Sequence, residues 1–204
     1  MDWENQPDKF RRVLGSRSVD LPRSGTAATV PDGVSLWSLD ALGVLLHDAA
    51  GITAWKSQGN GAKYSLRANP SSGALQPLEI FYFGAVGAED PSQWHYNAYW
   101  HSLEYIAPLP MVNRWAAVLE QLPEGAALIG LTTIVWRNAW KYGDPGFRES
   151  SCCTDVLCCL RRAAHVDSTA LPVQATLTTT SAIKFRPLPS LLPPRTPQWC
   201  CSTH

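Results

Sequence analysis

The stretch Arg67-Ala-Asn-Pro-Ser-Ser-Gly-Ala-Leu-Gln-Pro77 decides which fold this sequence encodes. Asn69 before Pro70 favours an extended or turn geometry, because the proline ring restricts the residue that precedes it. Ser71 or Ser72 can then cap a helix, since a serine hydroxyl accepts a hydrogen bond from a free backbone N–H group. The stretch therefore predicts a turn followed by a helix N-terminus.

Two more residues of this turn suit a bound ligand. Gly73 lets a ligand approach the backbone without a Cβ atom in the way. Arg67 adds a permanent positive charge, and the free N–H groups at a helix start favour an anion or an electron-rich ring edge. The stretch is therefore either the binding turn for a flat, electron-accepting ligand or an ordinary surface loop.

Helices and strands are expected on both sides of the turn. The clearest helix runs from Ser38, which can act as its N-cap, to Gly51, which ends it. Further helices are expected at 113–122 and 137–142, strands at 78–85 and 127–135, and a hairpin at 94–104 with a turn at Asn97-Ala98. This order predicts an α+β domain.

Composition indicates one soluble domain whose partners are small molecules or proteins. The chain has 204 residues, of which 45% are hydrophobic, enough to bury one sizeable core. Lysine plus arginine and aspartate plus glutamate number 17 each, so no excess positive charge marks a nucleic-acid or acidic-membrane surface. No uncharged run is long enough to span a bilayer, and residues 1–4 lack the features of a secretory signal. We expect a cytoplasmic protein without nucleic-acid or membrane partners.

The six cysteines do not indicate a metal site. They occur as the pairs 152–153, 158–159 and 200–201, so none lies in the tryptophan-rich part of the chain. The pattern Cys-Cys-x4-Cys-Cys lacks the two-residue gap with which a loop wraps zinc. We therefore expect no bound metal.

The two histidines of the expected hairpin, His95 and His101, also carry no metal signature. A two-residue turn at Asn97-Ala98 would pair His95 with Trp100 and direct His101 to the opposite face. No carboxylate or cysteine accompanies either histidine at ligand spacing. We expect both to be surface or structural residues.

Three further segments strengthen the ligand interpretation of the 67–77 turn. These are Asp2-Trp-Glu-Asn-Gln-Pro-Asp-Lys-Phe-Arg-Arg12, Gly51-Ile-Thr-Ala-Trp-Lys56 and Trp136-Arg-Asn-Ala-Trp-Lys-Tyr-Gly-Asp-Pro-Gly-Phe-Arg148. With the turn, they occur in the order found in the nitroreductase-like superfamily. The turn resembles in particular the SagB-type (azoline dehydrogenase-like) branch, whereas the first two segments resemble a longer bacterial-type group of the superfamily and the third its Lys-Tyr-Gly segment. That branch places an arginine and Pro-Ser-x-Gly-x-x-x-Pro ahead of a central strand.

The resemblance implies a fold, a cofactor and a reaction. The fold would be a mixed sheet flanked by helices, and the cofactor would be FMN. The reaction would be oxidation of a small organic or peptide-borne substrate by hydride transfer to the flavin. The residues implied to bind the cofactor are Arg67, Pro70, Ser71, Ser72 and Gly73.

The resemblance also implies catalytic roles for the Lys-Tyr pair near position 141. Lys141 would be the general base that removes a proton from the substrate, and Tyr142 would be its partner. A lysine needs a pKa lowered towards neutrality for that task, which burial beside Trp136 and Trp140 could provide. Without the resemblance, the pair has a structural interpretation, in which the lysine extends to solvent and the tyrosine only packs against its neighbours.

The resemblance ends after Arg148. Residues 1–148 are expected to form a partial nitroreductase-like FMN domain, and residues 149–204 an irregular, divergent tail rich in cysteine, threonine and proline. A reading-frame shift or a mis-spliced end would explain that composition. The site could then need a homodimer or a second homologous half. The alternative function is a catalytically inactive fragment or a flavin-free binding module.

Overall fold

The computed structural model describes residues 2, 4–23, 38–57, 59, 61–87, 90–109 and 128–146, together with the backbone of 182–184. The helix expected at 113–122 and all six cysteines lie outside these residues. Within the described part, no helix is long and apolar enough to cross a membrane.

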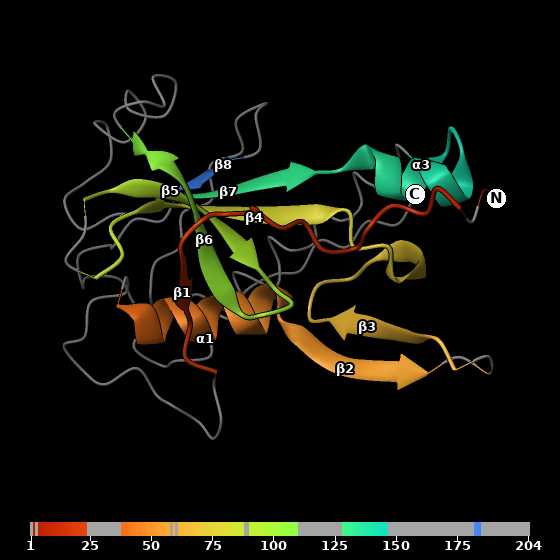
Figure 1. The fold of residues 1–204 in the computed structure, drawn as a ribbon, viewed down its shortest axis with the longest axis horizontal. Helices are drawn as coiled ribbons and strands as arrows, with labels where there is room; N and C mark the ends of the chain where they lie inside the picture. Colours follow the sequence, from red (N-terminus) through yellow and green to blue (C-terminus); the bar gives the residue numbers. More distant parts are fainter. Residues whose placement is uncertain are drawn as a thin grey trace, which may run out of the picture.

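A six-stranded sheet in the order β1-β6-β5-β4-β7-β8 forms the centre of the described structure (Figure 1). Its strands are β1 (Ser18–Asp20), β4 (Leu78–Gly84), β5 (Ser92–Asn97), β6 (Ser102–Pro108), β7 (Leu128–Thr133) and β8 (Ala182–Lys184). β4 and β7 confirm two expected strands. Every described pairing is antiparallel, so the mixed sheet expected from the resemblance is not found among these strands. β8 lies within residues 149–204, which the sequence predicts to be irregular, so that expectation is wrong at 182–184.

One face of the sheet packs on α1 (Leu39–Ala50), a helix that begins and ends where the sequence predicts (Figure 1). The Ser38 hydroxyl caps it by accepting a hydrogen bond from Ala41 N at 3.2 Å. Leu42 and Leu46 are buried against apolar side chains from alternate positions of the strands. Those side chains are Leu78, Ile80, Tyr82, Trp94, Tyr96, Leu103, Ile129 and Leu131. This is the main hydrophobic core.

The opposite face of the sheet carries buried charged groups. Glu79, His95 and Glu104 come from three neighbouring strands and are only 3%, 1% and 8% exposed. The N-terminal segment reaches this face, because Val13 N donates to Glu104 Oε2 at 3.0 Å. The two faces of the sheet therefore differ in chemistry as well as in what covers them.

The β5–β6 hairpin closes with a four-residue turn, so the expected two-residue turn is wrong. Asn97 pairs with Ser102, and its Oδ1 accepts hydrogen bonds from Tyr99 N at 3.0 Å and Trp100 N at 3.3 Å. An asparagine side chain that bonds the backbone two residues later stabilises a turn in this way. The side chain of Asn97 thus selects the longer turn.

The longer turn changes the environment of both histidines. His95 pairs with Glu104 instead of Trp100, so the expected pairing is wrong. His95 and His101 are 1% and 3% exposed. Both are therefore structural residues of the interior and not surface residues.

Two further elements lead into the 67–77 turn and away from it. A separate ribbon of β2 (Ile52–Ser57) and β3 (Lys63–Arg67) ends at the start of the turn (Figure 1). α3 (Val135–Tyr142) follows β7 and confirms the short helix expected there. Its start is held beside the end of the turn, because Ile134 N donates to Pro77 O at 2.7 Å.

Both ring nitrogens of His101 are hydrogen-bonded at the hairpin turn. Its Nε2 lies 3.0 Å from the carbonyl oxygen of Pro22 and must donate there, because a carbonyl only accepts. In the neutral ring, Nδ1 then accepts from the Tyr96 hydroxyl at 2.9 Å. Burial lowers the pKa of His101; the Pro22 hydrogen bond raises it, and the charges of His47 and Arg23 lower it further.

We expect acidification to weaken the fold through His101. Because the pKa of the folded ring lies below its ordinary value of about 6.5, the unfolded chain binds the proton first, and stability is lost as the pH falls below that value. His101→Asn should flatten this dependence, since asparagine tolerates the φ of 57° found here. Urea unfolding of both proteins at about pH 7.5 and about pH 5.5 measures the difference. Equal losses in both proteins would contradict this role of His101.

Candidate functional site

The 67–77 turn contains a single turn of 3-10 helix, η1 (Ser72–Ala74), and does not begin an α-helix. Gly73, Ala74 and Gln76 have φ angles of 60°, 53° and 52°. Ser71 makes no side-chain cap, and its Oγ accepts a hydrogen bond from Gln76 N at 2.8 Å. The expected helix N-terminus is therefore wrong, and the helix-dipole argument falls with it, because one kinked turn aligns too few peptide dipoles.

The predicted catalytic pair lies directly against this turn. A Cβ atom placed on Gly73 would lie 2.6 Å from Lys141 Nζ and 2.7 Å from the Tyr142 hydroxyl oxygen. Both side chains belong to α3, which is far from the turn in sequence. The fold therefore brings three of the predicted site residues together.

The other predicted cofactor residues of the turn are reachable from solvent. Pro70 and Gly73 are exposed, and Ser71 and Ser72 are half-buried. A ligand can approach the backbone of the turn without unfolding it. Their contacts with a cofactor stay a prediction.

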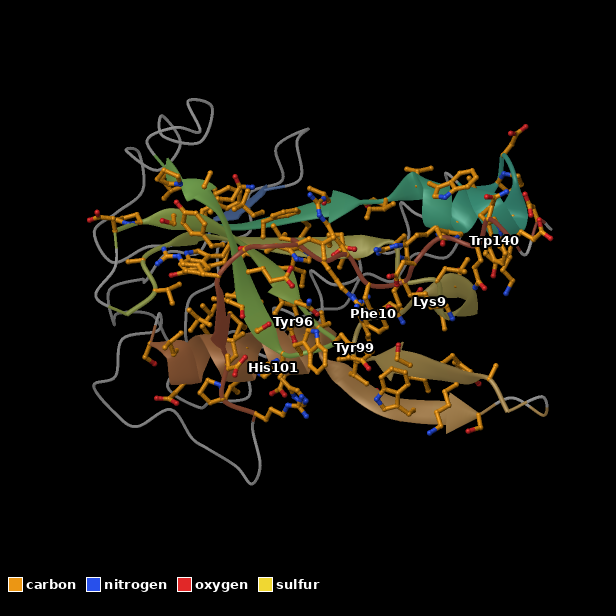
Figure 2. All side chains as sticks on the ribbon, in the orientation of Figure 1. Lys9, Phe10, Tyr96, Tyr99, His101 and Trp140 are labelled. Atoms are coloured by element: carbon orange, nitrogen blue, oxygen red, sulfur yellow. The ribbon has the colours of Figure 1, made fainter. Side chains whose placement is uncertain are left out.

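Arg67 lies half-buried at the start of the turn, among aromatic and charged groups. Its guanidinium lies 5.0 Å from the centre of the Phe10 ring, and Nη2 donates to the carbonyl oxygen of Lys9 at 3.4 Å (Figure 2). Its Nε is buried without a hydrogen-bond partner. Burial lowers the pKa of Arg67 to about 10, with Glu79 opposing that shift and Arg137 adding to it. Arg67 therefore remains a cation at neutral pH.

Trp136 does not bury Lys141 as expected, because Trp136 is itself 57% exposed. Trp140 is half-buried, and its Nε1 donates to the carbonyl oxygen of Asp2 at 2.5 Å. Lys9 of the N-terminal segment lies close enough to Lys141 for their charges to interact. Burial, and then the charge of Lys141, lower the pKa of Lys9.

Sequence analysis missed Arg137, which joins the parts of the site. Its side chain is 3% exposed and its Nε donates to Asp8 O at 2.7 Å. Its Nη1 donates to Gln76 O and to Glu79 Oε1, each at 2.5 Å. α3, the turn, β4 and the N-terminal segment therefore meet at one guanidinium. The sequence feature that predicts a buried cation here is Glu79, because a carboxylate in an otherwise apolar strand requires a positively charged partner.

Glu79 continues into a chain of hydrogen bonds across the sheet. His95 Nε2 lies 2.7 Å from Glu79 Oε2, and its Nδ1 lies 3.0 Å from Glu104 Oε2. Asn97 Nδ2 donates to Glu104 Oε1 at 2.6 Å. The imidazole ring of His95 therefore bridges the two carboxyl groups. Arg137 adds a permanent cation beside Glu79 in the interior.

Buried amide groups without hydrogen-bond partners occur in the turn and in α3. They are Asn69 Oδ1, Gln76 Oε1 and both polar side-chain atoms of Asn138. Folded proteins satisfy nearly all buried polar atoms, so these atoms point to a ligand or to water. FMN fits this set, because its ring edge carries C=O and N–H groups that amides can pair, and Arg67 suits a phosphate or a reduced flavin.

Solved structures similar to this chain include two that are described here. One is a protein from Anabaena variabilis that is provisionally named a nitroreductase. It is 26% identical to this chain, with a TM-score of 0.67, and the match covers 81% of this chain and 34% of that chain. The E. coli microcin synthetase McbBCD complex with truncated pro-MccB17 bound matches over 86% of this chain and 67% of that chain, at 18% identity and a TM-score of 0.49, too low to support an argument. No family model and no curated protein matches the sequence. This chain thus spans about a third of the length of the Anabaena protein.

We expect removal of the Arg137 guanidinium to lower the free energy of unfolding by about 3–5 kcal/mol, because the buried Glu79 carboxylate loses its arginine partner and keeps only its hydrogen bond with His95. Arg137→Met keeps an unbranched side chain without the charge, and urea unfolding measures the loss. Adding Glu79→Gln should restore part of the stability, since glutamine carries no charge. Additive effects in this double-mutant cycle would contradict the coupling.

Proposed function

This chain has the nitroreductase-like fold, and we propose that residues 1–148 form an FMN-dependent oxidoreductase domain of the SagB type. The proposed substrate is a small organic or peptide-borne molecule. The observation that supports the proposal most is the contact of Lys141 Nζ and the Tyr142 hydroxyl with Gly73, at 2.6 Å and 2.7 Å from its ideal Cβ position. Candidate base and candidate cofactor turn come from separate motifs, and the fold makes them neighbours.

The proposed reaction divides the work between cofactor and chain. FMN, when bound, supplies the acceptor for a hydride. Lys141 in its neutral form accepts at Nζ the proton that leaves the substrate, and the Tyr142 hydroxyl orients the reacting group. Two electrons leave with the hydride and the proton stays on the lysine, so the substrate gains a double bond. Gly73 presents a backbone surface without a Cβ, on which a flat ring can lie.

The proposed partner is a second half of the site. This chain spans 34% of the Anabaena protein, so most of that protein has no counterpart in it. We propose that a second copy of this chain or a homologous half completes the site. The competing function, a flavin-free binding module, is separated from the oxidoreductase by the presence of flavin.

We expect the protein to bind FMN and to show the visible absorbance of oxidised flavin. Lys141→Gln should keep the flavin but slow its anaerobic reduction by a thiazoline- or oxazoline-containing peptide about 10²–10⁴-fold, the usual contribution of a general base. Absorbance of the bound flavin measures both occupancy and rate. Lys63→Gln is the matched control, because Lys63 is an exposed lysine on β3.

Two outcomes would decide against parts of this proposal. Folded protein without flavin absorbance after incubation with FMN would remove the oxidoreductase and favour the flavin-free module. Equal reduction rates for Lys141→Gln and Lys63→Gln would remove Lys141 from the reaction while leaving the flavin assignment in place.

A further inference from the structure

Asn138 is a buried amide that the described fold leaves without a partner. Its side chain is 0% exposed, and neither Oδ1 nor Nδ2 has a hydrogen-bond partner. Asn97, at 1% exposure, shows the usual case: its Nδ2 donates to Glu104 and its Oδ1 accepts from two backbone N–H groups. Burial without such partners removes the hydration of an amide and replaces it with nothing. Asn138 therefore requires an explanation outside the packing of the fold.

α3 places Asn138 on the helix face that meets the 67–77 turn. Residues three and four positions apart share a helix face, so Asn138 lies one turn before Lys141 and Tyr142 on the same side. The ends of those two side chains lie against Gly73. The unpaired amide is therefore directly adjacent to the proposed site.

Lys141 and Tyr142 are the side chains of this helix face that a ligand on Gly73 would displace. Helical side chains lean towards the N-terminus of the helix, so these two side chains are directed towards the helical turn that carries Asn138. A flat ligand placed on Gly73 would move these flexible ends aside and uncover the amide. Gln76 Oε1, on the turn, is likewise buried without a partner.

We infer that Asn138 hydrogen-bonds the edge of a planar ring that presents a C=O group and an N–H group side by side. The inference rests on the proposed function, in which that ring is the pyrimidine part of FMN. A carboxamide donates through Nδ2 and accepts through Oδ1, so only a ligand with both complementary groups satisfies it. A phosphate only accepts and an aliphatic group does neither, so each would leave Asn138 partly or wholly unpaired.

Asn138→Leu tests the inference, because leucine has a similar volume and no polar atom. In the flavin-free protein the Tm should rise or stay unchanged, since an unpaired buried amide is replaced by an apolar group. In the same variant the dissociation constant for FMN should rise about 10- to 100-fold, the effect of losing one or two hydrogen bonds. Thermal unfolding and titration by flavin fluorescence measure the two effects on the full chain.

Two controls separate a ligand contact from a structural one. Asn97→Leu makes the same substitution at an asparagine whose partners are all present, so it should lower the Tm of the flavin-free protein. Riboflavin carries the same ring as FMN without the phosphate. Asn138→Leu should therefore weaken the binding of riboflavin and of FMN by the same factor.

Each contrary result has a distinct meaning. FMN binding by Asn138→Leu equal to that of the wild type overturns this inference alone, as does a fall in flavin-free Tm equal to that of Asn97→Leu. A loss confined to FMN, with riboflavin unchanged, overturns the assignment to the ring edge. A wild-type protein that binds neither flavin removes the proposed function and this inference together.

Discussion

The described structure depends on the burial of one guanidinium group, that of Arg137. A cation in a protein interior is tolerated only where acceptors surround it. Arg137 finds them in Asp8 O, Gln76 O and the carboxylate of Glu79. Gln76 and Glu79 lie at the junction of the 67–77 turn and β4, whereas Asp8 belongs to the N-terminal segment, far away in sequence. α3, the 67–77 turn and the N-terminal segment therefore cannot separate without leaving a charge unpaired in the interior.

The two faces of the sheet contribute differently to the fold. On the α1 face, apolar side chains pack on one another, and such contacts tolerate exchange between residues of similar volume. On the other face, hydrogen bonds connect Glu79 through His95 to Glu104 across three neighbouring strands. We regard the apolar face as the main source of stability and the polar chain as a link between the strands beside the site.

Local pattern was sufficient to predict several elements. The periodicity from Ser38 to Gly51 predicts α1, and apolar runs predict β4 and β7, because each pattern involves residues that are near neighbours in sequence. The same approach failed at the β5–β6 turn, where the Asn97 side chain replaces backbone contacts and lengthens the turn. It failed again in the 67–77 stretch, where Ser71 bonds Gln76 N instead of capping a helix.

The sequence by itself determined the positions of the main elements and the chemical groups available to the site. The motifs placed Arg67, Gly73, Lys141 and Tyr142 among the candidates before any distance was known. Only the tertiary structure decided that Lys141 and Tyr142 meet Gly73, that Lys9 approaches Lys141, and that Asn138 is buried without a partner. The physical reason is that periodicity reports contacts a few residues apart, whereas these distances depend on strand order, register and the docking of α3, which many residues set together.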